Sequence, residues 1–113
     1  MRYLDNHFLQ KAYYLSGGNQ QKIVLAKWLF VEPRIILLDE GTRGIDVGAK
    51  REIYNIVNSL ASGGVSFIMV SSELQEVIQM SNRIMVMYEG CIVSEFTREN
   101  ASEEEIIAKA TGL

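Results

Sequence analysis

The sequence predicts an α/β fold built around a mainly parallel sheet. Short apolar runs alternate along the chain with segments whose apolar residues recur at helical spacing, which is the pattern of strands joined by helices. The run at 35–38 is continuously apolar, as is typical of a strand covered on both faces. Further strands are predicted at 66–70, 83–88 and 91–96, and Glu89-Gly90 joins the last two as a two-residue hairpin turn.

Two helices are predicted in the first half of the chain. The first follows Gly18 and ends at Pro33. The second is capped by Asp46 and ends at Gly63-Gly64. The first helix is indicated by residues that fall at helical spacing: Ile23, Ala26, Lys27 and Phe30. The second has an expected buried stripe: Ala49, Ile53, Ile56, Val57 and Leu60.

Two capping-box patterns predict shorter helices in the second half. Ser72 with Gln75 opens a helix through Gln79, and Ser102 with Glu105 opens a helix that closes at Gly112. Three methionines on the predicted strands are expected to fill the core: Met69, Met85 and Met87.

The composition is that of an ordinary globular chain of about one small domain, with 113 residues, 48% hydrophobic and 22% charged. The net charge of −3 and the scattered basic residues argue against a nucleic-acid partner. No apolar run approaches the roughly 20 residues that cross a bilayer. A single cysteine, Cys91, excludes an internal disulfide and suits a reducing cytoplasm. Residues 1–14 fit no clean period and form a poorly defined N-terminal segment.

A glycine turn running into a helix indicates a phosphate contact. Ser16, Gly17 and Gly18 let the backbone approach another group closely, and the helix start that follows presents free amides and partial positive charge. Ser16 and Gln20 add side-chain hydrogen bonds. A bare Ser-Gly-Gly is more often a simple helix cap, so the phosphate interpretation depends on the motifs that follow.

A strand that ends in two carboxylates is the second candidate. Asp39 follows the apolar run directly and is suited to hold the hydration shell of Mg²⁺, which prefers oxygen ligands. Glu40 is suited to orient or deprotonate an attacking water. Asp46, at the next helix start, has a structural role as a cap that is compatible with a functional one.

These motifs closely resemble ABC-transporter ATPases. The resemblance lies in residues 15–22, in Asp39-Glu40 and in the segment 41–50, and it extends over residues 15–113. The stretch Arg43-Gly44-Ile45-Asp46-Val47-Gly48-Ala49-Lys50 is most similar to the second nucleotide-binding half of the tandem ATPases that power bacterial monosaccharide import. The resemblance implies a partial P-loop NTPase sheet with flanking helices, containing the C-terminal part of the nucleotide-binding domain and lacking the strand that leads into the phosphate loop.

The resemblance also implies residue roles. The family signature motif falls on Leu15, Ser16, Gly17, Gly18, Asn19 and Gln20. Asp39 takes the place of the Walker B aspartate, Glu40 that of the catalytic glutamate and Asp46 that of the D-loop aspartate. In this family two halves clasp head to tail, and the signature motif of one half closes over the γ-phosphate of ATP held by the other.

The sequence departs from the family pattern in three places. It contains no Gly-x-x-x-x-Gly-Lys-Ser/Thr phosphate loop, so the main anchor for ATP is missing and the chain alone is expected to be inactive. Ser72 stands at the position of the switch histidine and cannot act as an imidazolium. Gly41 stands where proline is usual, which loosens the turn after Glu40.

The resemblance implies a fragment of the ATP-binding and ATP-hydrolysing subunit of a sugar importer, acting on ATP with Mg²⁺. The expected partners are the other nucleotide-binding half and the membrane permease subunits, at the cytoplasmic face of the bacterial inner membrane. The alternative is a non-catalytic interaction module that docks on full-length ABC ATPases. A gap in the sheet is expected between the strands at 66–70 and 83–88, with a marginally stable fold as its consequence.

Overall fold

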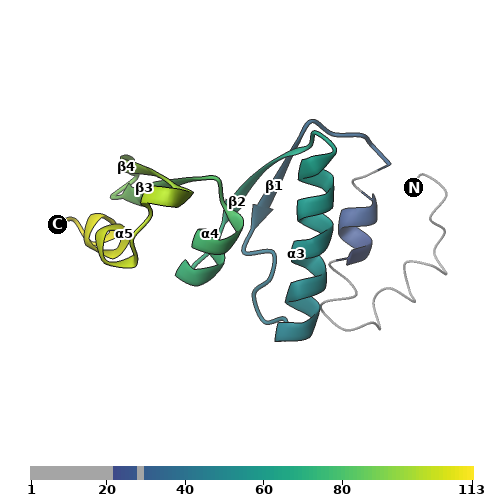
Figure 1. Cartoon of the computed structure of the whole chain (residues 1–113), viewed down its shortest axis with the longest axis horizontal. Coiled ribbons are helices and arrows are strands. Elements are labelled where there is room, and N and C mark those ends of the chain that lie inside the picture. The colour runs from purple at the N-terminus through teal and green to yellow at the C-terminus, as the bar shows by residue number, and fades with distance from the viewer. Residues whose placement is uncertain (1–21, 28–29) are drawn as a thin grey trace. The chain divides into compact units, whose positions relative to one another are not determined.

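The computed structural model describes residues 22–27 and 30–113 and places them in two compact units, which divide between Ile68 and Met69. Each unit is considered separately. The element order is strand and helix in alternation, followed by a hairpin and a terminal helix, as Figure 1 shows. The predicted α/β class is therefore confirmed.

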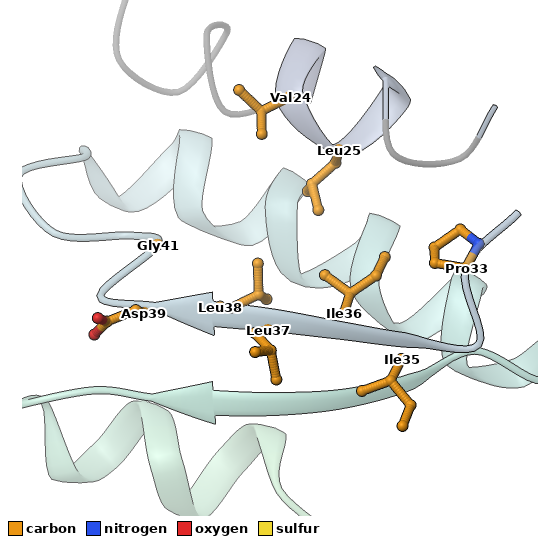
Figure 2. Close-up of a pocket in the computed structure, with 9 residues that line it drawn as sticks. All are labelled: Val24, Leu25, Pro33, Ile35, Ile36, Leu37, Leu38, Asp39 and Gly41. Atoms are coloured by element: carbon orange, nitrogen blue, oxygen red, sulfur yellow. The ribbon is translucent and has the colours of Figure 1, made fainter. Parts of the chain in front are cut away.

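The first unit is a β-α-β arrangement with an additional helical stretch at 22–27. Strand β1 (Ile35–Asp39) leads into helix α3 (Val47–Ser62), and α3 leads into strand β2 (Ser66–Val70). The two strands pair in one sheet, and their arrows point the same way in Figure 2, so the pair is parallel. The pairing starts where Ser66 N donates to Arg34 O at 2.8 Å.

Helix α3 begins and ends at the residues that the sequence predicts. Asp46 is its N-cap and accepts a hydrogen bond from Ala49 N. At the other end Gly64 has a left-handed φ of 104° and donates to Ala61 O, while Val65 donates to Leu60 O. This pair of bonds is a Schellman motif, which satisfies carbonyls that the helix leaves open. The predicted stripe is confirmed, with Ile53 and Val57 as its buried members.

Strand β1 is covered on one face only, which corrects the prediction of a strand buried on both faces. Ile36 is 6% exposed, whereas its neighbours Ile35 and Leu37 are 58% and 71% exposed. In Figure 2 Ile36 and Leu38 point toward α3 and the 22–27 helix, while Ile35 and Leu37 point away from these two helices. Strand β2 alternates in the same way, with Phe67 half-buried and Ile68 exposed. A continuous apolar run cannot reveal which face the folded unit leaves open.

The buried residue of the 22–27 helix is Leu25, which is not among the residues that the sequence places at helical spacing. Leu25 is 1% exposed, and Figure 2 shows its side chain pointing toward β1. Ile23 and Ala26 are half-buried, Lys27 is exposed and Phe30 lies in a turn with its side chain 70% exposed.

The second unit is a β-hairpin packed against a short terminal helix. Strand β3 (Arg83–Tyr88) pairs antiparallel with strand β4 (Cys91–Thr97), with an irregularity between Val86 and Met87. Glu89 and Gly90 have φ values of 47° and 80°. Two left-handed residues form a type I′ turn, the type that matches the twist of a hairpin. The predicted two-residue turn is confirmed.

The core of the second unit is formed by one face of β3 and by helix α5 (Glu103–Ala110). Its buried residues are Ile84, Val86 and Ile106, with side chains of helix α4 (Leu74–Met80) packed against them. A short 3₁₀ turn, η1 (Arg98–Asn100), joins β4 to α5. Met85 and Met87 lie on the opposite face of β3 and are exposed. The prediction that they fill the core is wrong, while Met69 on β2 is half-buried.

One of the two predicted capping boxes is confirmed at its N-cap. Ser102 accepts a hydrogen bond from Glu105 N at 3.4 Å and caps α5. Ser72 does not cap α4: the N-cap is Glu73, whose side chain makes no cap hydrogen bond, and Glu73 N donates to Ser71 Oγ at 3.0 Å. The Ser72-Gln75 box is therefore wrong, because the helix begins one residue later than the pattern requires.

The described residues form two separate two-stranded sheets, β1 with β2 and β3 with β4. The gap expected between the strands at 66–70 and 83–88 stays a prediction. None of the helices in the described part of the chain is long and apolar enough to span a bilayer.

Candidate functional site

Asp39 and Glu40 lie together at the carboxyl end of β1. Asp39 is the last residue of the strand and is exposed, and Glu40 follows it half-buried. Glu40 has a φ of 53°, in the left-handed region that residues with a side chain rarely adopt. Such a backbone costs about 1–2 kcal/mol. A strained residue at a strand end is the kind of outlier that accompanies a functional site, because only surrounding structure keeps it in place.

Two consecutive turns connect Glu40 to the next helix. Arg43 N donates to Glu40 O at 3.1 Å, and Ile45 N donates to Thr42 O at 3.2 Å. Gly44, the third residue of the second turn, has a φ of 76°. A type II turn needs a positive φ at this position, which explains the glycine. The carboxylates at 39 and 40 are thereby linked to Asp46 through a short, hydrogen-bonded loop.

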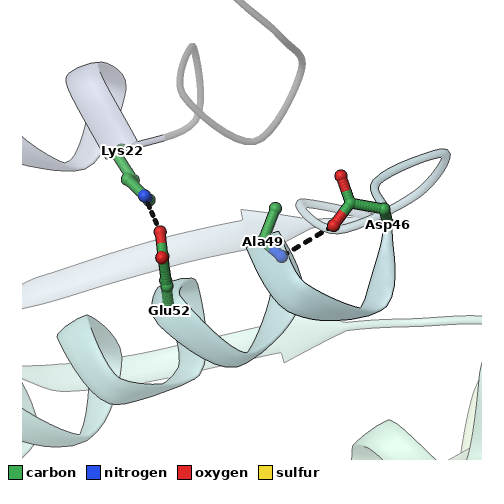
Figure 3. Close-up of polar contacts among 4 residues, drawn as sticks. All are labelled: Lys22, Asp46, Ala49 and Glu52. Carbon is green, nitrogen blue, oxygen red and sulfur yellow. Dashed lines mark hydrogen bonds and ion pairs between the residues drawn. The ribbon is translucent and has the colours of Figure 1, made fainter.

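Asp46 connects this loop to the start of α3. Its backbone is extended, and its Oδ1 accepts from Ala49 N at 2.9 Å, as Figure 3 shows. The negative charge also lies at the positive end of the helix dipole. The predicted structural role of Asp46 as a helix cap is confirmed.

An ion pair ties the 22–27 helix to α3. Lys22, the last residue of the motif segment 15–22, pairs with Glu52 on α3 (Figure 3). Glu52 lies six residues, or about 1.7 helical turns, after the cap at Asp46. The start of the described helix is therefore held beside the first turns of the helix that Asp46 caps.

A pocket of about 460 Å³ lies along β1, between the strand and the 22–27 helix (Figure 2). Its walls are apolar, apart from Asp39 and Gly41 at one end. The lining residues are Val24, Leu25, Pro33, Ile35, Ile36, Leu37, Leu38, Asp39 and Gly41. Asp39 is the only residue in this lining with a charged or polar side chain.

The structure brings together only part of the predicted site. Asp39, Glu40 and Asp46 lie on one short loop of the first unit. Ser72 belongs to the second unit, exposed between β2 and α4. The predicted signature residues Leu15, Ser16, Gly17, Gly18, Asn19 and Gln20 lie outside the described residues. Sequence reasoning gave no role to Thr42, which is buried in the same loop. The signal in the sequence was a threonine in a short loop with glycines at positions 41 and 44.

Asp39 fits Mg²⁺ as a contributor and not as a complete site. No group of three or more His, Cys, Asp or Glu side chains among the described residues is placed to hold a metal ion. Mg²⁺ is commonly held by one or two carboxylates, with water and substrate phosphates as its other ligands. An exposed carboxylate at a strand end matches that manner of binding.

Comparisons with known proteins decide the family. The family described as ABC transporter matches residues 1–43. The chain is 64% identical over 98 residues to the xylose import ATP-binding protein of Moorella thermoacetica, a match that covers 87% of this chain. It is 61% identical over 103 residues to the ribose import ATP-binding protein of Halalkalibacterium halodurans, covering 91% of this chain. The chain belongs to the ABC-transporter ATPase family. It spans about a fifth of the length of these relatives, 19% and 21%.

Solved structures support the same assignment. The ADP conformation of an ATP-binding cassette of an ABC transporter matches with a TM-score of 0.70 and 28% identity, over 88% of this chain and 37% of that one. A dimeric bacterial ABC transporter cassette matches with a TM-score of 0.66 and 27% identity, over 77% of this chain and 38% of that one. The two units thus form a fragment of the P-loop NTPase fold, as the sequence predicts.

Proposed function

We propose that this chain supplies the signature motif and the Walker B carboxylates to the ATP site of a sugar-import ATPase. The observation that carries the proposal is the 64% identity over 98 residues to a xylose import ATP-binding protein. The placement of Asp39 and Glu40 at the exposed end of a parallel strand supports it, because ligands of open α/β sheets bind outside the carboxyl ends of the strands. The names of the relatives favour this function over a non-catalytic docking module.

In the proposed site each carboxylate has a separate task. Asp39 holds Mg²⁺ through its hydration shell, and the ion, when bound, neutralises charge on the phosphates. Glu40 accepts a proton from the attacking water or orients it toward the γ-phosphate.

The remaining residues act across a dimer. We propose that residues 15–20 close over the triphosphate of a partner nucleotide-binding half, with backbone amides as the phosphate ligands. Asp46 takes the D-loop position, and Ser72 takes the switch position with a hydroxyl in place of an imidazole. The dimeric cassette among the matching structures is consistent with such an arrangement.

We propose a setting on the basis of the family resemblance, which the names of the relatives support. Residues 15–113 represent the C-terminal part of the second nucleotide-binding half, and the partners are the other half and the permease subunits. The assembly is peripheral to the cytoplasmic face of the bacterial inner membrane. The chain has no phosphate-loop sequence, so we propose that a segment with that loop binds the triphosphate of ATP.

A measurement of nucleotide binding to the chain alone tests whether the main ATP-binding residues lie outside it. A fluorescent ATP analogue titrated with Mg²⁺ into the purified chain is expected to show no binding in the micromolar range. Micromolar binding, or ATP hydrolysis by the chain without a partner protein, would show that these residues bind the triphosphate themselves.

A hybrid protein tests the catalytic assignment. In this hybrid the chain replaces its 98 matching residues in the Moorella xylose import ATP-binding protein. We expect Mg²⁺-dependent ATP hydrolysis that is abolished by Glu40→Gln and strongly reduced by Asp39→Asn. Glu95→Gln, on exposed strand β4, is the matched control and should leave hydrolysis unchanged. An inactive hybrid, or one indifferent to Glu40→Gln, contradicts the proposal.

A further inference from the structure

We propose that Thr42 is a positioning residue for Glu40, an inference that rests on the function proposed above. Thr42 is 6% exposed and is the one buried polar residue in the described part of the first unit. It stands two residues after Glu40 and four before Asp46. A hydroxyl-bearing side chain is therefore enclosed at the centre of the loop that joins these two carboxylates.

Thr42 has the only buried side chain among residues 41–44. Gly41 and Gly44 have none, and Arg43 is exposed. A Cβ added at Gly44 would meet nothing within 4 Å, so the loop touches no neighbour there. Of residues 41–44, Thr42 alone sends its side chain into the unit.

Thr42 belongs to both turns of the loop. It is the third residue of the turn closed by Arg43 N and Glu40 O, and its own carbonyl accepts from Ile45 N in the next turn. Its β-branched side chain has few rotamers, so fixing the side chain also fixes the backbone. No buried side-chain nitrogen or oxygen of the described residues lacks a hydrogen-bond partner, so a buried threonine hydroxyl is held by polar contacts.

Glu40 needs such an anchor. Its φ of 53° is unfavourable for a residue with a side chain, and the glycine that follows it adds backbone freedom. Strained conformations persist only where the surrounding structure enforces them. We therefore assign to Thr42 the role of holding the backbone of Glu40 in place, so that its carboxylate stays directed at the attacking water.

The first test measures the loop directly by amide hydrogen exchange. Thr42→Val keeps the side-chain shape but removes the hydroxyl, and Thr42→Ser keeps the hydroxyl. In Thr42→Val the amides of Arg43 and Ile45 should exchange about tenfold faster, because the turns open more often. The Ser66 amide, bonded to Arg34 O at 2.8 Å, should exchange at the original rate and report the stability of the rest of the unit.

The second test measures catalysis in the hybrid protein. Thr42→Val should lower kcat by about tenfold or more, since small misplacements of a reacting group have large effects on rate. The KM for ATP should not change, because phosphate binding lies elsewhere. Thr42→Ser should restore most of the rate. Thr97→Val is the matched control, since the side chain of Thr97 makes no cap hydrogen bond and lies on β4.

The outcomes separate this inference from the proposed function. If Thr42→Val leaves the exchange rates of the Arg43 and Ile45 amides unchanged, or accelerates the Ser66 amide equally, the anchoring role is overturned, whether or not the hybrid protein is active. An active hybrid in which Thr42→Val retains its kcat, or in which Thr42→Ser is as impaired as Thr42→Val, also overturns it. A hybrid that hydrolyses no ATP counts against the proposed function, and the exchange measurement then decides the role of Thr42 in the loop.

Discussion

The ring of Tyr88 lies directly against the backbone of Gly112. A Cβ built on Gly112 would fall 2.6 Å from Tyr88 Cζ and 2.8 Å from its Oη. Gly112 also has a φ of 89° and donates to Lys109 O, while Leu113 N donates to Ala108 O. The glycine therefore completes a Schellman motif after α5 and leaves room for the aromatic ring of β3.

Gly112→Ala should destabilise the second unit by about 2–4 kcal/mol. The left-handed backbone accounts for about 1–2 kcal/mol, and the collision with Tyr88 adds the cost of moving a ring out of its contact. Hydrogen exchange of the α5 amides, analysed by residue, gives the free energy of opening for this unit alone.

Gly90→Ala is the control for the backbone cost. Gly90 has a φ of 80°, yet nothing lies within 4 Å of a Cβ at that position. Gly90→Ala should therefore cost less than Gly112→Ala, and adding Tyr88→Ala to Gly112→Ala should remove most of the difference. Equal costs at the two glycines would show that the ring contact contributes nothing.

Arg98 stabilises the end of α4, and its replacement should loosen that helix. Its Nε donates to Ser81 O at 3.0 Å and its Nη2 donates to Gln79 O at 3.2 Å. A cation at a helix C-terminus interacts favourably with the open carbonyls and the dipole. Arg98→Lys cannot reproduce a two-nitrogen fork and should cost about 1 kcal/mol. Exchange rates of the Val77 and Ser81 amides would report the loss.

Arg83→Lys is the comparison for Arg98→Lys. Arg83 pairs with Glu95 across the β-hairpin, with the two side chains 63% and 50% exposed. Exposed ion pairs typically contribute about 0–1 kcal/mol, and 0.5 M salt should weaken this pair more than the carbonyl contacts of Arg98. If Arg98→Lys were as mild as Arg83→Lys, the carbonyl contacts would not hold α4.

Two substitutions of Asp46 should separate its role as a helix cap from its proposed D-loop role. Asp46→Ala loses the acceptor for Ala49 N, which is 2.9 Å away, and should cost about 1 kcal/mol in the stability of α3. Asp46→Asn keeps an acceptor and should retain that stability. If the D-loop assignment is right, Asp46→Asn nevertheless lowers ATP hydrolysis in the hybrid protein.

Ser102→Ala provides the cap comparison on α5. The Ser102 acceptor lies 3.4 Å from Glu105 N, a long hydrogen bond, and its removal should cost less than Asp46→Ala. Urea titration monitored at each helix would rank the two. A larger loss at Ser102 would indicate that bond length does not govern the strength of these caps.

Local patterns predicted the elements of this chain well. Gly63-Gly64, Glu89-Gly90 and Gly112 mark their turns correctly because a positive φ is a property of a few adjacent residues, which the sequence displays directly. The Ser72 cap failed because the helix starts at Leu74 after the N-cap Glu73, one residue later than the pattern requires. A helix start that differs by one residue cannot be decided from spacing alone.

Burial was predicted less well, because it depends on what lies across from each face. The methionines at 85 and 87 share a face of β3 that no described element covers, while Ile84 and Val86 face α5. At the candidate site, chemistry made Asp39 and Glu40 recognisable. Thr42 was not recognised, because its importance comes from burial and from its place between two turns.

The two faces of β1 allow a direct test of how much burial differs between neighbouring residues of one strand. Ile36 is 6% exposed and Leu37 is 71% exposed, although both belong to the same apolar run. Ile36→Ala should cost about 2–5 kcal/mol, because it opens a cavity against the helices. Leu37→Ala should change stability by no more than about 0.5 kcal/mol and should reduce self-association, since it removes exposed apolar surface. Chemical denaturation of the two variants, with light scattering for association, distinguishes the faces. Equal losses of stability would mean that β1 is covered on both sides after all.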